Sequence, residues 1–210
     1  MSRNSSFMNR NNSPVRISLT GGTGSGKSTA LAFFSGLGAA CLDSDKVVHR
    51  LLERPDVRRL VAESLGLDGL PVGEPGRRRL AEVVFGDRAR LTALEKVLFP
   101  LVREEIRAWF DQNEVKQAPA AVVEIPLLFE AGMEDLFDRV VLITAPRELR
   151  RRRQSGRMEP ADFESRVARQ MPEAGKRRRA DTVFENEGPP ARLEEFIREF
   201  MAVLKRPDQR

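Results

Sequence analysis

The stretch SLTGGTGSGKSTALAFF, at residues 18–34, constrains the fold more than any other part of the chain. It follows the short β-branched run VRISLT, which has the composition of a buried strand. It leads into residues 27–37, where apolar residues recur at helical spacing. Between the two, four residues fit the pattern G-x-x-x-x-G-K-[ST]: Gly21, Gly26, Lys27 and Ser28. The sequence therefore predicts a strand, a tight glycine-rich turn and a helix.

A turn of this kind indicates a site for a nucleoside triphosphate. Glycines allow successive N–H groups to point inward, and they leave room for phosphate oxygens. We expect Lys27 to neutralise the β- and γ-phosphates and the Ser28 hydroxyl to ligate Mg²⁺. The alternative is a glycine-rich turn with an incidental lysine. The residues predicted to bind the nucleotide here are Gly22, Thr23, Gly24, Ser25, Gly26, Lys27, Ser28 and Thr29.

The order of the other predicted elements favours an α/β fold. Apolar runs of strand length occur at residues 39–42, 120–125, 139–144 and 181–184, and helical patterns separate them. This alternation predicts a five-stranded, mostly parallel sheet flanked by helices. We expect a loop at residues 66–76. We expect Pro100 to bend or split the helix predicted at residues 88–112.

Composition narrows the classes of function. The 210 residues carry a net charge of +5, which favours anionic partners, and no apolar run is long enough to span a membrane. The single cysteine favours a reducing cytoplasm, and the polar residues 1–14 are interpreted as a disordered leader. Basic residues cluster at 147–157 and 176–179, but the chain lacks the interleaved aromatic residues typical of single-strand binders, so nucleic acid is an improbable partner. Nothing indicates an obligate protein partner.

Two acidic segments follow predicted strands. In LDSDKVVH, Asp45 is placed to accept a proton from an attacking hydroxyl, and Asp43 could hold a metal-bound water. Both aspartates could instead cap the following helix. In VVEIPLLFE, Glu124 could reach the magnesium water shell, or it could be a surface carboxylate at the end of a strand.

The chain contains the segments GGTGSGKST, LDSDKVVHRLL, LEKVLFPLV, IPLLFE and DTVFENEG. In this order and at these intervals, the segments together resemble the dephospho-coenzyme A kinase family. The resemblance runs from about Val15 to Leu204. Its specificity rests on the combination, because the glycine loop alone occurs in many kinases.

The resemblance implies a P-loop kinase fold that uses ATP and Mg²⁺ to phosphorylate the ribose 3′-hydroxyl of dephospho-CoA, the last step of coenzyme A synthesis. It implies that Asp45 is the base and that Asn186 belongs to the nucleotide site. It also implies a nucleotide-binding core at residues 15–49, 118–146 and 171–205, a helical substrate domain at 50–117 and a lid at 147–170.

The chain departs from the family pattern in two places. Phe99 stands where the family usually has histidine, so a substrate contact by that histidine is absent. The register of the lid arginine is also open among Arg151, Arg152 and Arg153. Spacing from Pro146 favours Arg152, with Arg157 as a second contact.

Two other classes of function remain open at this point. A nucleoside or nucleotide kinase would phosphorylate nucleosides rather than dephospho-CoA. A nucleic-acid-binding ATPase would bind RNA or DNA with a steep salt dependence.

Overall fold

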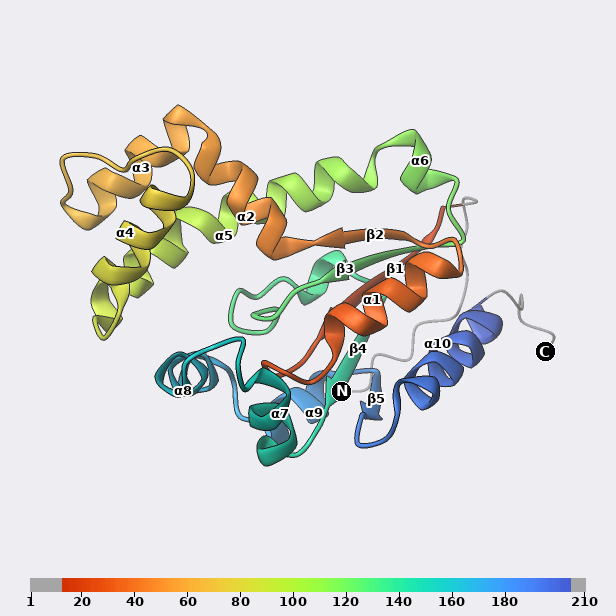
Figure 1. Ribbon diagram of the computed structural model, residues 1–210. Coiled ribbons are helices and arrows are strands. Elements are labelled where there is room, and N and C mark those ends of the chain that lie inside the picture. The colour runs from red at the N-terminus through yellow and green to blue at the C-terminus, as the bar shows by residue number, and fades with distance from the viewer. Residues whose placement is uncertain (1–12, 205–210) are drawn as a thin grey trace. The chain divides into compact units, whose positions relative to one another are not determined.

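The computed structural model describes residues 13–204, and Figure 1 shows the order of its elements. Most of the predicted leader, residues 1–12, lies outside the described residues. The strands are β1 (Val15–Thr20), β2 (Ala40–Asp43), β3 (Ala120–Glu124), β4 (Arg139–Thr144) and β5 (Thr182–Glu185). The helices are α1 (Lys27–Gly36), α2 (Ser44–Glu53), α3 (Pro55–Leu65), α4 (Glu74–Val84), α5 (Arg88–Phe110), α6 (Asn113–Lys116), the short 3₁₀ helix η1 (Glu134–Leu136), α7 (Arg147–Gln154), α8 (Pro160–Arg169), α9 (Glu173–Arg179) and α10 (Pro190–Leu204).

The five strands form one sheet in the order β2-β3-β1-β4-β5. Strand β1 pairs in parallel with both β3 and β4, and β4 pairs in parallel with β5. The predicted α/β fold with a parallel sheet is therefore confirmed. Because β1 is central, the loop that follows it lies at the carboxyl edge of the sheet, where ligands bind in open α/β folds.

Helices α1 and α10 lie side by side against the sheet, as Figure 1 shows. Alternate residues of β1, β3 and β4 pack with these helices. The residues between them, such as Ala121, Val123 and Leu142, are buried as well, so these strands read as continuous apolar runs. The residues of this core include Ile17, Leu19, Ala30, Phe34, Val122, Val141, Ile143, Leu193 and Ile197. The close packing of α1 on the sheet fixes the position of its first turn, which carries the glycine loop.

Of the two outcomes predicted at Pro100, a bend or a split, the split does not occur, because α5 runs unbroken from Arg88 to Phe110 with Pro100 inside it. A proline removes one hydrogen bond from a helix, but packing of an apolar stripe can offset that loss. Leu94, Leu98, Val102 and Ile106, four residues apart, are all buried. The stripe holds the helix together across the proline.

The loop predicted at residues 66–76 ends three residues earlier than expected, because α4 begins at Glu74. Pro75 lies in the first turn of α4, where its missing N–H has no helical partner to lose. Gly76 is buried within the helix, and a side chain there would collide with the carbonyl oxygen of Pro71.

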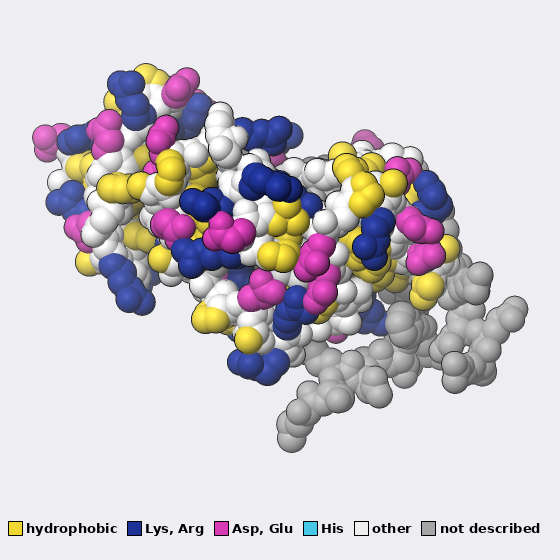
Figure 2. Space-filling model, turned by 60° about the horizontal axis from the view of Figure 1, so that its bottom comes forward, with side chains coloured by type: hydrophobic (Ala, Val, Ile, Leu, Met, Phe, Trp, Pro, Cys, Tyr) yellow, Lys and Arg dark blue, Asp and Glu magenta, His cyan; other side chains and the backbone are white. Residues whose placement is uncertain are grey.

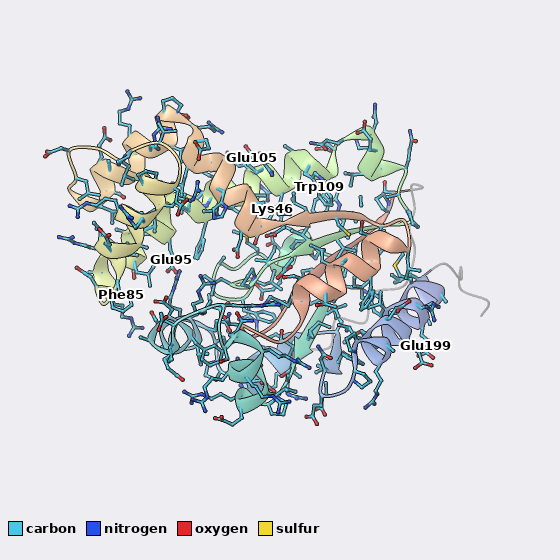
Figure 3. All side chains as sticks on the ribbon, in the orientation of Figure 1. Lys46, Phe85, Glu95, Glu105, Trp109 and Glu199 are labelled. Atoms are coloured by element: carbon cyan, nitrogen blue, oxygen red, sulfur yellow. The ribbon has the colours of Figure 1, made fainter. Side chains whose placement is uncertain are left out.

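The chain divides into two compact units, one formed by the residues up to Leu42 and from Phe110 onward, the other by Asp43–Trp109. The second unit is helical, and it overlaps the segment predicted to bind the acceptor. Exposed ion pairs such as Arg54–Asp56 and Arg77–Glu53 occur within it. Phe85, labelled in Figure 3, is 61% exposed at the end of α4, whereas Trp109 is half-buried on α5.

No helix among residues 13–204 has the length and apolar character needed to cross a membrane. On the face shown in Figure 2, Lys and Arg side chains are interspersed with Asp and Glu. This mixing gives no broad basic surface on that face.

Candidate active site

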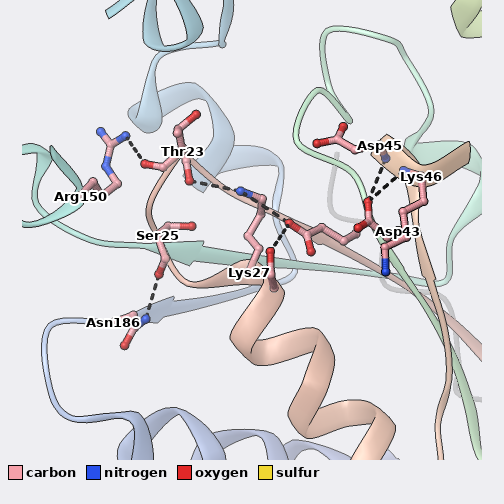
Figure 4. A network of polar contacts seen from close by, with 11 residues as sticks. Thr23, Ser25, Lys27, Asp43, Asp45, Lys46, Arg150 and Asn186 are labelled. Atoms are coloured by element: carbon pink, nitrogen blue, oxygen red, sulfur yellow. Dashed lines mark hydrogen bonds and ion pairs between the residues drawn. The ribbon is translucent and has the colours of Figure 1, made fainter. Parts of the chain in front are cut away.

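The glycine loop connects the end of β1 to the start of α1, as predicted. Gly24 and Gly26 have φ angles of 78° and 102°, in the left-handed region that favours glycine. Lys27, the first residue of α1, is buried, and its Nζ donates to the carbonyl oxygen of Gly22 at 3.2 Å. The side chain of Lys27, at the end of the loop, therefore reaches back to the backbone near the start of the loop, as Figure 4 shows.

At two positions of the loop, both the backbone φ angle and the nearness of other atoms exclude a residue larger than glycine. A Cβ atom on Gly21 would lie 2.0 Å from the carbonyl oxygen of Ile143, and one on Gly26 would lie 2.3 Å from Asn186 Nδ2. The loop is thus packed against β4 and against the residue that follows β5. Because glycines occupy these positions, backbone atoms form the inner side of the turn, and phosphate oxygens can approach them closely.

Glu124, the last residue of β3, lies beside the loop and is buried. The Ser28 hydroxyl donates to Glu124 Oε1 at 3.3 Å, and Lys27 Nζ lies 4.0 Å from the same oxygen. The strand register explains the meeting, because Glu124 pairs with Leu19 on β1 just before the loop begins. Two of the three residues predicted to serve the metal, Ser28 and Glu124, are therefore brought together.

Ser28 and Glu124 offer oxygen ligands of the kind that Mg²⁺ prefers. Within residues 13–204 there is no group of three or more His, Cys, Asp or Glu residues that could hold a metal ion. Mg²⁺ commonly takes one or two protein oxygens and completes its shell with substrate phosphates and water. The side chains at the loop therefore suit a metal that arrives with a nucleotide.

Asn186 follows β5, and its side chain is hydrogen-bonded to the glycine loop. Its side-chain amide donates to the carbonyl oxygen of Ser25 at 2.8 Å, as Figure 4 shows. Its own backbone carbonyl accepts from Arg153 on α7 at 2.9 Å. Asn186 thus contacts the backbone of the loop directly and ties it to α7.

Arg150 is the site residue that the sequence analysis missed. It is buried, its Nε donates to the Ala145 carbonyl at 3.0 Å, and its Nη1 donates to the Thr23 carbonyl at 3.4 Å. Burial lowers the pKa of the Arg150 guanidinium. Helical spacing from Pro146 could have identified it, because residues 149, 150 and 153 share the inward face of α7.

The two predicted lid arginines lie elsewhere on this segment. Arg152 and Arg157 are exposed and line an open cavity of about 1120 Å³ between α7 and α8. Arg151 is also exposed and pairs with Glu148 one turn away. The third candidate in the arginine run, Arg153, bonds to the backbone carbonyl of Asn186 beside the glycine loop.

Asp43 and Asp45 are at the start of the helical unit. Asp43 is the N-cap of α2, and its Oδ1 accepts from the N–H groups of Asp45 and Lys46. The capping interpretation of Asp43 is therefore correct as a description of its hydrogen bonds. Asp45 lies in the first turn of α2 with an exposed side chain. Thr29, in the first turn of α1, is exposed as well.

A parallel sheet with a phosphate-binding loop after its central strand, a buried lysine and a carboxylate beside the loop defines a P-loop kinase. A protein-family model described as dephospho-CoA kinase matches residues 15–191. The chain belongs to the dephospho-CoA kinase family.

Individual relatives agree with this assignment. A dephospho-CoA kinase of Rhodopseudomonas palustris is 36% identical over 197 residues, which cover 92% of this chain and 98% of the relative. A crystal structure from Thermus thermophilus superposes with a TM-score of 0.75 at 37% identity, covering 92% of this chain and all of that one. A dephospho-CoA kinase from Campylobacter jejuni shares the fold, with a TM-score of 0.60 at 24% identity over 90% of this chain and 96% of that one.

Proposed function

We propose that this chain transfers the γ-phosphoryl group of ATP to the ribose 3′-hydroxyl of dephospho-CoA and so forms coenzyme A. Membership of the dephospho-CoA kinase family over residues 15–191 is the observation that carries the proposal. The hydrogen-bonded glycine loop supports the choice of ATP as phosphoryl donor. The single cysteine and the need for ATP favour a cytoplasmic location.

In this mechanism the glycine loop holds the triphosphate by its backbone N–H groups. Lys27 is already held across the loop, so its ammonium group can neutralise the β- and γ-phosphates with little rearrangement. When bound, Mg²⁺ would supply charge neutralisation at the phosphate oxygens, with Ser28 and Glu124 as the residues that hold it. Asp43 would contribute at most through a water, because its Oδ1 already caps α2.

Asp45 is proposed to take the proton from the 3′-hydroxyl as that oxygen attacks phosphorus. Its support is the family resemblance of LDSDKVVH and the exposure of its side chain at the start of α2. A general base of this kind contributes about 10²–10⁴-fold to rate. Its proton must return to solvent after transfer, and an exposed carboxylate allows this.

Residues 147–170 are proposed to form a lid over ATP. A lid is useful because water competes with the acceptor hydroxyl for the phosphoryl group. Arg151, Arg152 and Arg157 all line the open cavity of the segment. Because Arg151 is already paired with Glu148, Arg152 and Arg157 are the arginines proposed to meet the phosphates on closure. Arg150 and Arg153 instead tie α7 to the loop and to Asn186.

The proposal is tested by replacing Asp45 and by varying the acceptor. Asp45→Asn should lower transfer to dephospho-CoA by about 10²–10⁴-fold while changing ATP affinity little. Glu199→Gln is a matched carboxylate-to-amide control on the exposed side of α10, and it should keep full activity. Near-normal turnover in Asp45→Asn would reject the base, and faster ADP release with nucleosides than with dephospho-CoA would reject the acceptor.

A further inference from the structure

Lys176 is a buried cation to which the proposed phosphoryl-transfer mechanism assigns no role. It lies on α9 with 3% of its side chain exposed, and its Nζ is 3.6 Å from Glu130 Oε1. Among residues 13–204, neither Nζ nor Glu130 Oε2 has a hydrogen-bond partner. Burial lowers the pKa of Lys176, although Glu130 opposes the effect. Burying an ammonium group costs stability even beside the acidic side chains of Glu130 and Glu173, so the position of Lys176 calls for an explanation.

Glu130 connects this lysine to the end of the proposed lid. Besides pairing with Lys176, Glu130 accepts a hydrogen bond from the backbone N–H of Met171. Met171 lies between α8 and α9, immediately after residue 170, where the lid segment ends. Glu130 itself belongs to the loop that leaves β3 after Glu124, the carboxylate beside the glycine loop. One side chain therefore joins the exit of the lid to the strand that carries a site residue.

The entrance of the lid is held by a separate set of contacts. Arg150 bonds to the carbonyls of Ala145 and Thr23 at the first turns of α7. Between entrance and exit, Arg147 pairs with Glu164 and the buried Phe163 packs within the segment, so α7 and α8 are tied to each other. A segment joined internally, and held at its two ends, can move as one piece only about those ends.

We propose that Glu130 and Lys176 are positioning residues that hold the exit of the lid in the register needed for it to close over ATP. This inference rests on the proposed function. Lys176 balances the charge of Glu130, which keeps that carboxylate buried and aimed at the Met171 N–H. Without Lys176, Glu130 would be drawn toward water and the lid exit would lose its attachment. Water would then reach the γ-phosphorus more often, giving ADP and inorganic phosphate in place of ADP and phosphorylated acceptor.

The test uses Lys176→Met, Glu130→Gln and the double variant in the full chain. Wild type should form one ADP per phosphorylated dephospho-CoA, and each single variant should release several-fold more ADP per product while kcat falls. The double variant should recover part of the loss, because no unbalanced charge remains. Arg178→Met, an exposed neighbour on α9, should match wild type in both measurements.

Amide hydrogen exchange gives a readout that does not depend on transfer. A non-hydrolysable ATP analogue should slow exchange in residues 147–172 of wild type and of Arg178→Met, and it should do so much less in Lys176→Met. Equal protection in all variants, or lower thermal stability with an unchanged ratio of ADP to product, would overturn the proposal. Failure of wild type to phosphorylate dephospho-CoA would reject the proposed function instead, and the exchange experiment would still test the pair.

Discussion

The glycine loop and helix α7 are both rich in groups that bind anions, yet they differ in how far those groups are fixed beforehand. In the loop, Lys27 is buried and bonded to Gly22, and Ser25 is held by Asn186. On α7, Arg151 and Arg152 are exposed, and Arg151 forms an ion pair with Glu148 on the same helix. The loop is therefore organised before ligand arrives, whereas most of the arginine run must be oriented by ligand. Substitutions in the glycine loop should therefore affect turnover and stability more than substitutions of the exposed arginines on α7.

The largest effect is expected from removing the charge inside the loop. Lys27→Ala should lower transfer by about 10²–10³-fold, because a preorganised cation is lost from the developing charge. The measurement is steady-state ADP release with dephospho-CoA. Lys116→Ala, an exposed lysine on α6, is the control and should keep wild-type turnover. A Lys27 variant within a few-fold of wild type would remove the distinction between loop and helix.

A smaller effect should follow from a methyl group placed in the loop. Gly26→Ala combines a left-handed φ with a collision at Asn186 Nδ2, and it should cost about 1–3 kcal/mol of unfolding free energy and weaken ATP binding. Gly36→Ala, at the end of α1 with open space around it, is the matched change and should stabilise by up to about 1 kcal/mol. Urea denaturation and nucleotide titration measure both. Equal behaviour of the two variants would mean that the loop is not tightly packed.

Within α7, replacing a buried arginine should reduce stability more than replacing an exposed one. Arg150→Ala should lower unfolding free energy by about 1–3 kcal/mol, because the Ala145 and Thr23 carbonyls lose a charged donor. Arg152→Ala should change stability by less than about 0.5 kcal/mol and act on turnover alone. Thermal melts with paired kinetics check this. The comparison fails if Arg152→Ala destabilises as much as Arg150→Ala.

The contrast also explains what could be predicted from the sequence. The glycine loop was predictable because its residues are consecutive, so the chain itself fixes their geometry. The parallel sheet was predictable from buried apolar runs of strand length. Matching the segment to a family pattern from Pro146 pointed to Arg152, whereas helical spacing places Arg150 on the inward face of α7, where it contacts Thr23 and Phe163. The pairing of Glu130 with Lys176 depends on residues 46 positions apart, and no local pattern encodes it.

The smallest effect concerns Cys41 on β2, whose thiol donates to the Leu31 carbonyl on α1. Burial raises the pKa of Cys41 from 9.0 to about 11, so at pH 8 only about one thiol in a thousand is ionised. Its contribution to stability is present below pH 9 and is lost as pH rises through about 11. Alkylation by iodoacetamide at pH 8 should be slow, and ATP should leave the rate unchanged if α1 and its loop are already in place. A large change on adding ATP would show that α1 rearranges.

The central claim is that this preformed loop delivers a phosphoryl group to one hydroxyl of dephospho-CoA. Incubation with dephospho-CoA and ATP, followed by mass spectrometry and phosphorus NMR of the product, tests it most directly. The account predicts one added phosphate on the ribose 3′-oxygen and one ADP per product. An unmodified acceptor, or phosphate attached elsewhere, would contradict it.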